Sequence, residues 1–358
     1  MLEYVRVENL KIGDICAKSL YDENGFILCE ENKSLSVHTI KTIREFGYKG
    51  IYVLHPGNNR RELIPLMEPL FEDAVLIDLY KTTRSLFRNH EVIYNAFDSQ
   101  FMEDKKKLHE LMDQIVDALI KAEKEGKLLF EVEDQRTFNT WIFFHSVMVC
   151  FLSIGIAIKM GLPRKDITDI ALAAIYHDVG KARVDAKVVN SREITEAERE
   201  ILRNHPENMF LFLKKHGYSM TTLFGVRQHH EKMDGTGYPL GLKGKLIAQS
   251  ARIIACADEY DHLVNKDPYK KLSLYAAEAI EYMSVNQEHD IECLKALFQI
   301  VAPYTVGTKV KLSNGDEALV VKNSSLQPLR PVVLVDKDVI KLDSDSHYLN
   351  VTITEIIK

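Results

Sequence analysis

The pattern of hydrophobic and polar positions divides the chain into a mixed beginning, a helical middle and a β-rich end. Residues 1–58 contain short β-prone runs around one helical stretch, which predicts a small α/β module. Residues 59–130 follow a helical pattern, with apolar side chains at Val75, Leu79 and Leu86. This stretch is therefore predicted to be a helical connector, either packed on the next domain or forming a stalk.

The remaining two thirds of the chain are predicted to form a large helical domain and a small β module. Residues 131–300 are almost wholly helical in pattern, and residues 301–358 hold short β-prone runs separated by turn residues. Residues 140–158 are uncharged and long enough to cross a membrane. Because His145 and Ser146 lie inside that run and no second span accompanies it, we interpret it as a buried core helix.

Composition and charge narrow the class of protein. The 358 residues exceed one typical domain, and the net charge of −6 argues against binding to a nucleic-acid polymer. The five cysteines are scattered and form no CxxC pair, which is typical of reduced thiols in a cytoplasmic protein. The first residues contain no long apolar segment, so neither a secretory signal nor membrane attachment is expected.

The passage from His229 to Pro239 carries the most specific chemistry. Two adjacent histidines, His229 and His230, end a helical run and lead directly into a loop with Gly235 and Gly237. Neighbouring side chains on a helix diverge by about 100°. Both rings can therefore bind one metal ion only if the helix is distorted or ends at this pair.

The helical domain contains further residues that could bind metal. They occur along the chain in the order His145, His177-Asp178, His205, His229-His230 and Asp258. Taken singly, each has an ordinary structural explanation, such as a hydrogen-bonded core histidine or a helix end. Together they form a mixed imidazole and carboxylate set, which suits iron, manganese or zinc. Seven ligands exceed the needs of one ion, but would be used fully by two ions that share a bridging aspartate.

These motifs give the chain a resemblance to a known family. With His177-Asp178 and the Gly-Tyr-Pro sequence at 237–239 in this order, the chain resembles the HD-GYP subgroup of HD-domain metal phosphohydrolases. Members of that subgroup are bacterial enzymes that hydrolyse cyclic di-GMP. The resemblance covers about residues 130–300 and implies a mainly α fold, with a helical HD-type bundle as the catalytic domain. More loosely, residues 1–57 resemble the small N-terminal module that often precedes this domain.

The resemblance also implies an activity in signal transduction. A phosphoric diester hydrolase of this kind would convert cyclic di-GMP to pGpG, with GMP as a further product, by attack of metal-bound hydroxide at a binuclear centre. We expect Asp178 to bridge two ions, of iron or manganese, with zinc, nickel and cobalt as alternatives. One ion would be held by His145, His177 and Asp258, and the other by His205, His229 and His230.

Several residues are candidates for contacts with the cyclic dinucleotide. Lys181, three residues after the bridging aspartate, is expected to contact the substrate phosphate and assist catalysis, although a surface charge is the alternative. Tyr238 could stack on guanine or pack within its loop, where Gly235 and Gly237 shape the backbone. Lys270 supplies one cation of a basic motif that follows the last metal aspartate in the family.

The sequence departs from the family pattern at two positions. Trp141 stands where some relatives carry a glutamate that supports a third ion, so we expect a binuclear centre. Asp267 stands where an arginine is usual, with Lys266 beside it. This reversal motivates one alternative, activity on another cyclic or linear nucleotide. The flanking modules at 1–57 and 301–358 motivate another, a weakly active cyclic-dinucleotide-binding signalling protein.

Two groups of residues are left outside this centre. The terminal modules are candidates for contacts within a homodimer or with a signalling partner. His216, His262 and His289 lie outside the motif and are interpreted as structural.

Overall fold

The structure, a computed structural model, describes most of the chain. The described residues are 2–17, 20–21, 27–30, 33–46, 48, 50–54, 73–88, 99–130, 141–183, 195–265, 274–336 and 338–357. The chain divides into two compact units. One unit contains Leu70–Phe130 and Trp141–Val301, and the other contains Met1–Pro69, Glu131–Thr140 and Ala302–Lys358. The predicted fold class, mainly α with a small module at each end, is confirmed.

The N-terminal module is a small α/β structure. Its elements are β1 (Leu2–Arg6), η1 (Val7–Asn9), β2 (Ile15–Cys16), β3 (Leu20–Tyr21), β4 (Ile27–Cys29), α1 (Val37–Glu45) and β5 (Gly50–Leu54). The antiparallel sheet has the order β1-β5-β2, and β3 pairs with β4. Helix α1 begins where the Ser36 side chain accepts a hydrogen bond from the Thr39 amide. Ile43, Ile51 and Val53 form part of the buried core.

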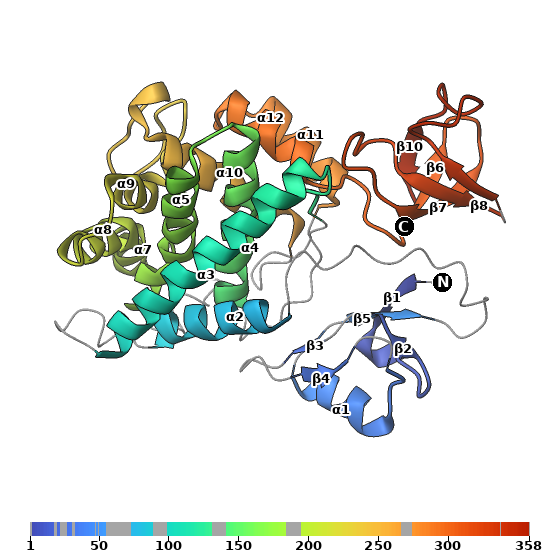
Figure 1. Cartoon of the computed structure of the whole chain (residues 1–358), viewed down its shortest axis with the longest axis horizontal. Coiled ribbons are helices and arrows are strands. Elements are labelled where there is room, and N and C mark those ends of the chain that lie inside the picture. Colours follow the sequence, from blue (N-terminus) through green and yellow to red (C-terminus); the bar gives the residue numbers. More distant parts are fainter. Residues whose placement is uncertain are drawn as a thin grey trace. The chain divides into compact units, whose positions relative to one another are not determined.

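The helical unit contains the elements that carry the candidate site (Figure 1). They are α2 (Asp73–Arg88), α3 (Ser99–Lys124), α4 (Trp141–Lys159), α5 (Arg164–Tyr176), η2 (Val179–Arg183), α7 (Glu196–Arg203), α8 (His205–Lys215), α9 (Met220–Gln228), η3 (Gly244–Leu246), α10 (Gln249–Val264), α11 (Ala276–Val285) and α12 (Ile291–Ile300). Helices α2 and α3 pack against α4 and α5. The connector therefore packs on the helical domain instead of forming a stalk, while the predicted domain boundaries stay predictions.

Helix α4 lies at the centre of the helical unit. It packs against α5, α10 and α12, and Val147, Leu152 and Ile156 are fully buried. Among the helices that the structure describes, none combines the length and apolarity that crossing a membrane requires. The uncharged segment is therefore a core helix, as predicted.

Two glycines allow the close helix contacts that assemble the site. A Cβ at Gly225 on α9 would lie 2.8 Å from the Ala173 Cβ on α5. A Cβ at Gly180 in η2 would lie 2.5 Å from the carbonyl oxygen of His205 at the start of α8. Since ordinary contacts between carbon atoms require about 3.5–4.0 Å, neither approach admits a side chain. The backbones of these four segments are consequently drawn together around the ends of α5 and α9.

The C-terminal module is a five-stranded antiparallel sheet. Its strands are β6 (Lys309–Leu312), β7 (Glu317–Lys322), β8 (Val332–Val335), β9 (Asp338–Lys341) and β10 (Ile353–Ile356), in the order β10-β6-β7-β8-β9. The β6–β7 turn contains Gly315 at a φ of +96°, a conformation that favours glycine. The buried core of the C-terminal module includes Val310, Val320 and Val333. The predicted β module is therefore present, with β9 as an additional strand.

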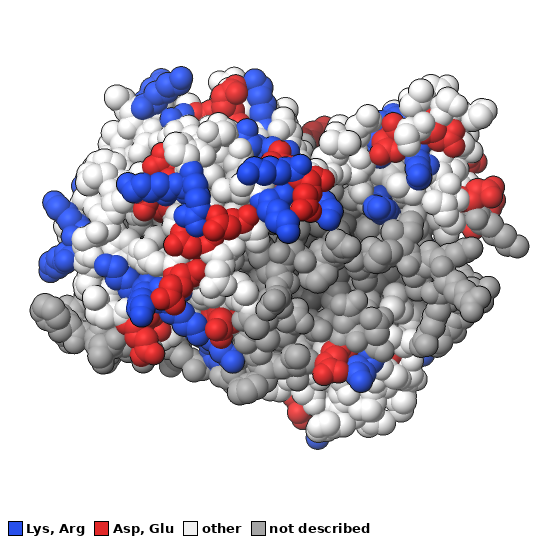
Figure 2. Space-filling view, viewed as in Figure 1, with Lys and Arg blue, Asp and Glu red and all other residues white. Residues whose placement is uncertain are grey.

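Charged side chains of both signs are mixed over the helical unit. Figure 2 shows lysines and arginines beside aspartates and glutamates on the visible face. Within this unit Arg164 donates hydrogen bonds to the carboxylates of both Asp113 and Asp117, so its charge is neutralised locally.

Candidate metal centre

Five segments of the helical unit bring all seven predicted ligands together. The side chains come from α4 (His145), the end of α5 (His177, Asp178), the start of α8 (His205), the end of α9 (His229, His230) and α10 (Asp258). Two groups have donor atoms within 4.8 Å of one another: Asp178 with His205, His229 and His230, and Asp178 with His145 and His177. Asp178 thus belongs to both groups, and each group could hold one ion.

The two oxygens of Asp178 face different histidines. Its Oδ2 lies 3.8 Å from His145 Nε2 and 3.6 Å from His177 Nε2. Its Oδ1 lies 3.4 Å from His205 Nε2 and 3.9 Å from His229 Nε2. A carboxylate placed in this way can contribute one oxygen to each of two neighbouring cations.

Asp258 joins the His145 side of the cluster. Its Oδ1 lies 2.9 Å from His145 Nε2 and 3.8 Å from His177 Nε2. The His177 and His230 Nε2 atoms are buried and have no hydrogen-bond partner among the described residues. Buried polar nitrogens usually have a partner, so these donor atoms fit the bonds that a transition-metal ion would supply.

Each of four ligand histidines is oriented through its other ring nitrogen. The Nδ1–H groups of His177, His205 and His229 donate to backbone carbonyls three residues earlier, at 2.6, 2.6 and 2.7 Å. His145 Nδ1 donates to Asp261 Oδ2 at 2.7 Å. Because carbonyl and carboxylate oxygens only accept hydrogen bonds, Nδ1 must carry the proton. In a neutral ring the Nε2 lone pair is therefore left for a metal.

Burial sets the charge state of most of these histidines. It lowers the pKa of His177 and His205 and holds the pKa of His229 and His230 well below the usual range. His145 differs. Burial opposes its protonation too, but the hydrogen bonds and charges of Asp258 and Asp261 outweigh burial and raise its pKa to about 9. Four of the rings are thus in the neutral form that binds metals.

The two aspartates are held in the ionised form. Burial acts to raise the pKa of Asp178, but the nearby Lys181 ammonium and the histidines outweigh it and bring this pKa well below its usual range. Burial likewise opposes ionisation of Asp258, and His262 and His145 lower its pKa well below that range. Both carboxylates are consequently available as anionic ligands.

The adjacent pair His229 and His230 lies where the helix ends. Helix α9 ends at Gln228, and the two ring centroids are 4.0 Å apart. The predicted helix end at this pair is confirmed, which explains how both rings approach one group of donors.

The loop after this pair is closed by a buried carboxylate. Glu231, which is only 3% exposed, accepts hydrogen bonds from the backbone amides of Leu240 and Leu242 at 2.7 and 2.9 Å. The Tyr238 amide donates to the His230 carbonyl, and the Tyr238 ring stacks on the His230 ring with centroids 4.7 Å apart. The structure thus shows Tyr238 packed against a candidate ligand.

The loop glycines have separate structural roles. A Cβ at Gly237 would collide with the Lys232 amide nitrogen and lie 2.5 Å from both Glu231 Cα and the His230 carbonyl oxygen. Gly235 has a φ of +88°, where other residues are strained. These glycines therefore allow the chain to fold back on the end of α9.

Of the two predicted cationic contacts, Lys181 lies within the described residues. Lys181 Nζ lies 2.7 Å from the Asp178 carboxylate, and its side chain is 20% exposed. It therefore lies at the edge of the metal cluster. Lys270, together with Lys266 and Asp267, lies outside the described residues.

His262 is a site residue that the sequence interpretation set aside. It lies one turn after Asp258 on α10, and its Nε2 is 3.4 Å from Asp258 Oδ1. With His145 and Asp258 it forms another group of donor atoms within 4.8 Å of one another. Burial lowers the pKa of His262 to about 3. The i,i+4 spacing from Asp258 was the signal in the sequence that could have identified it.

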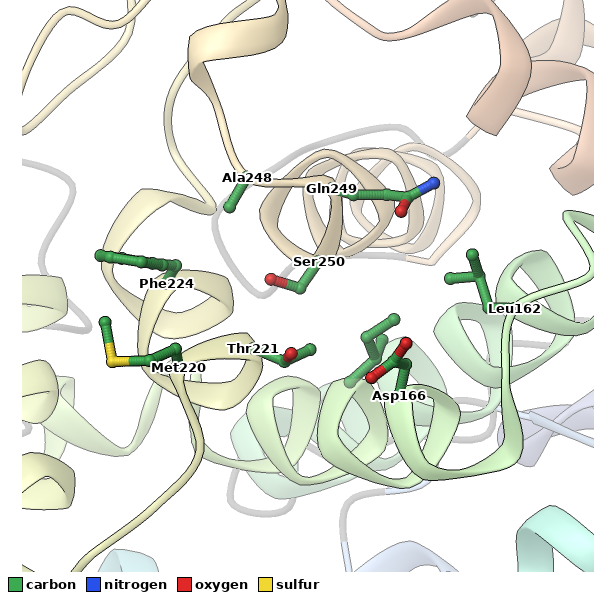
Figure 3. Close-up of a pocket in the computed structure, with 9 residues that line it drawn as sticks. Leu162, Asp166, Met220, Thr221, Phe224, Ala248, Gln249 and Ser250 are labelled. Atoms are coloured by element: carbon green, nitrogen blue, oxygen red, sulfur yellow. The ribbon is translucent and has the colours of Figure 1, made fainter.

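A separate cavity lies at the other ends of the ligand-bearing helices (Figure 3). It has a volume of about 230 Å³ and is lined by Asp166 on α5, Met220 on α9 and Ser250 on α10, among others. Asp166 is 11 residues from His177, which corresponds to about 16 Å along a helix. The cavity is therefore distinct from the metal cluster.

One family model matches the segment of the chain that carries the cluster. Residues 136–292 match the family model described as HD domain. A cyclic di-GMP phosphodiesterase of Pseudomonas aeruginosa is 32% identical over 229 residues, covering 63% of this chain and 54% of that protein. A 3'3'-cGAMP-specific phosphodiesterase of Vibrio cholerae is 32% identical over 155 residues, covering 43% of this chain and 34% of that protein.

One solved structure is also among the similar proteins. The HDG"Y"P protein Bd1817 of Bdellovibrio bacteriovorus is 17% identical, with a TM-score of 0.47, covering 83% of this chain and 98% of that one. The chain spans about half or less of the length of the two phosphodiesterases. The HD-domain match at residues 136–292 spans all seven candidate ligands, and the resemblance of this chain to the HD-GYP group is confirmed.

Proposed function

We propose that this chain is a metal-dependent phosphodiesterase that hydrolyses cyclic di-GMP to pGpG, with GMP as a further product. The observation that carries the proposal is the position of Asp178, whose two oxygens each face a different pair of histidines. The names of the related phosphodiesterases support the substrate class, a cyclic dinucleotide.

The geometry supports a division of the ligands between two divalent transition-metal ions. One ion would be held by Asp178 Oδ2 together with His145, His177 and Asp258. The other would be held by Asp178 Oδ1 together with His205, His229 and His230. Two such ions supply Lewis acidity toward the phosphodiester and activate water near neutral pH. Iron and manganese suit this set of donors, as do zinc, nickel and cobalt.

The chain's own residues prepare the site before substrate arrives. The hydrogen bonds at Nδ1 fix four rings with Nε2 toward the cluster, and Glu231 holds the Gly-Tyr-Pro loop closed. The Lys181 ammonium is partly exposed beside Asp178, so it can neutralise a phosphoryl oxygen of a bound substrate. The Tyr238 ring, stacked on the His230 ring, would limit how closely a bound substrate can approach that histidine.

Replacing Lys181 with alanine should separate catalysis from metal binding. We expect metal content to be retained and turnover to fall about a hundredfold, a typical loss when one group stabilising a transition-state oxyanion is removed. Steady-state hydrolysis and metal analysis of the same preparations measure the two effects. The exposed Lys245, replaced with alanine, is the matched control and should keep full activity. Full turnover in the Lys181 variant would exclude a phosphate contact.

Metal binding should displace the additional proton that His145 carries in the metal-free protein. At pH 6 the metal-free protein carries a proton on His145, whose pKa is raised to about 9, while His177, His205, His229 and His230 have lowered pKa values. Ordinary histidines, with a pKa of about 6.5, would be mostly protonated there. We therefore expect loading at pH 6 to release fewer protons than five ordinary histidines would, and metal affinity to rise with pH up to about 9 because the additional proton on His145 must leave.

Titration calorimetry in buffers of different ionisation enthalpy measures the released protons. Release of four or five protons at pH 6 would contradict the assigned protonation states. Affinity that stays constant between pH 6 and pH 9 would contradict the raised pKa of His145.

The function is tested by turnover with defined metal content. Anaerobically purified protein should contain two ions per chain and should convert cyclic di-GMP to pGpG. The related enzyme specific for 3'3'-cGAMP supports one other substrate, so both dinucleotides should be compared in competition. A preference for 3'3'-cGAMP would replace the proposed substrate. Binding without turnover of either dinucleotide by metal-loaded protein would refute the enzymatic proposal.

A further inference from the structure

We propose that His262 is an eighth metal ligand, on the His145–Asp258 side of the centre. The inference rests on the proposed metal-dependent function and adds one residue to the site. Neither the sequence motif nor the family match assigns a role to this histidine.

Helix α10 presents Asp258 and His262 on one face, since residues four apart on a helix lie one above the other. His262 Nε2 is 3.4 Å from Asp258 Oδ1, which is itself 2.9 Å from His145 Nε2. Donor atoms bound to one ion at about 2.1 Å lie about 3 Å apart when adjacent and about 4.2 Å apart when opposite, so these separations fit shared coordination.

The surroundings of His262 also direct it toward the cluster. Its ring lies 4.5 Å from the His145 ring, between centroids, and its side chain is only 20% exposed. The His145 ring is fixed from its far side by Asp261, which in turn accepts a hydrogen bond from Asn265. His145 thus cannot turn its Nε2 away from His262 without losing a buried hydrogen bond.

The additional ligand changes the balance between the two sides. Besides the shared Asp178, each side has three proposed donors: His205, His229 and His230 on one, and His145, His177 and Asp258 on the other. A ligand at His262 gives the His145 side a fourth. The other explanation for the 3.4 Å contact is a hydrogen bond from His262 to Asp258 that positions the carboxylate.

Three variants at this position distinguish a ligand from a hydrogen-bond donor. Glutamate offers a metal-binding oxygen but would repel Asp258 if no ion lay between them. Glutamine offers an N–H donor to Asp258 but is a poor ligand, and alanine offers neither. Metal-free protein is titrated anaerobically with Mn²⁺, and free Mn²⁺ is followed by electron paramagnetic resonance. This measurement does not depend on turnover.

We expect His262→Ala and His262→Gln to weaken the binding of one ion by about ten- to hundredfold, the range seen when a metal site loses a supporting group. His262→Glu should restore affinity to within about threefold of the wild type. His347, whose side chain is 88% exposed in the C-terminal module, is the control, and His347→Ala should bind as the wild type does.

Other outcomes overturn the inference. Wild-type affinity in the glutamine variant combined with weak binding in the glutamate variant would make His262 a positioning residue for Asp258. Wild-type affinity in all three variants would leave it no role in metal binding. Failure of the proposed function is separate: the wild-type protein would then bind no ions, or would bind them without hydrolysing either dinucleotide.

Discussion

Replacing Asp178 with alanine should remove both metal ions and abolish hydrolysis. Asp178 is fully buried, and its oxygens face His145 and His177 on one side and His205 and His229 on the other. Without this carboxylate, each group loses its shared anionic ligand. We expect turnover to fall at least about a thousandfold, since each 1.4 kcal/mol of lost transition-state stabilisation is a factor of ten and the ions supply several kcal/mol.

Metal analysis and steady-state hydrolysis of the same sample test this expectation. The matched control is Asp166→Ala at the opposite end of α5, beside the separate cavity, which should keep two ions and wild-type turnover. Far-ultraviolet circular dichroism would show whether the variants retain their helices. Retention of two ions, or of activity, in the Asp178 variant would contradict the bridging role.

Replacing Gly237 with alanine should disable the site without touching a ligand. The added methyl group would collide with backbone atoms of Lys232, Glu231 and His230, none of which can move as the tip of a flexible side chain could. The loop must open, and it would carry His230 and the Tyr238 stack with it. We expect turnover to fall about a hundredfold, which is the cost of a misplacement of about 1 Å in an active site.

Gly244, the first residue of η3, supplies the control for this substitution. Gly244 has a φ of +60°, but a methyl group there meets nothing within 4 Å. Gly244→Ala should therefore cost only about 1–2 kcal/mol of stability for the left-handed backbone and leave turnover near the wild-type level. Metal titration should show weaker binding in Gly237→Ala alone. Equal effects at both positions would contradict a special role for the close approach at Gly237.

The ligand positions could be predicted because their chemistry is local to short motifs. A histidine pair at a helix end and a His-Asp pair each limit where the side chains can point, and the structure brings all seven candidates together. The helical middle of the chain could also be predicted, because the periodic spacing of its apolar residues is local to each helix. By contrast, β2 and β3 are strands of only two residues, too short to show an alternating pattern, and were not predicted.

Contacts between distant segments could not be predicted from the motifs. The hydrogen bond from His145 to Asp261 joins residues 116 positions apart, and the close approach of Gly180 to His205 depends on how η2 meets α8. His262 shows the opposite case, because its spacing from Asp258 was visible in the sequence. It was set aside because it lies outside the family motif.

The Nδ1 hydrogen bonds of His177, His205 and His229 also complete three helices. Their acceptors are carbonyls in the last turns of α5, α7 and α9, which have no donor within their own helix. The partial negative charge at these carboxyl ends favours a nearby cation. Deleting one residue from such a last turn would rotate the ring by about 100° and break the bond that orients it. The lengths of these three helices are therefore as much a part of the binding site as the imidazoles themselves.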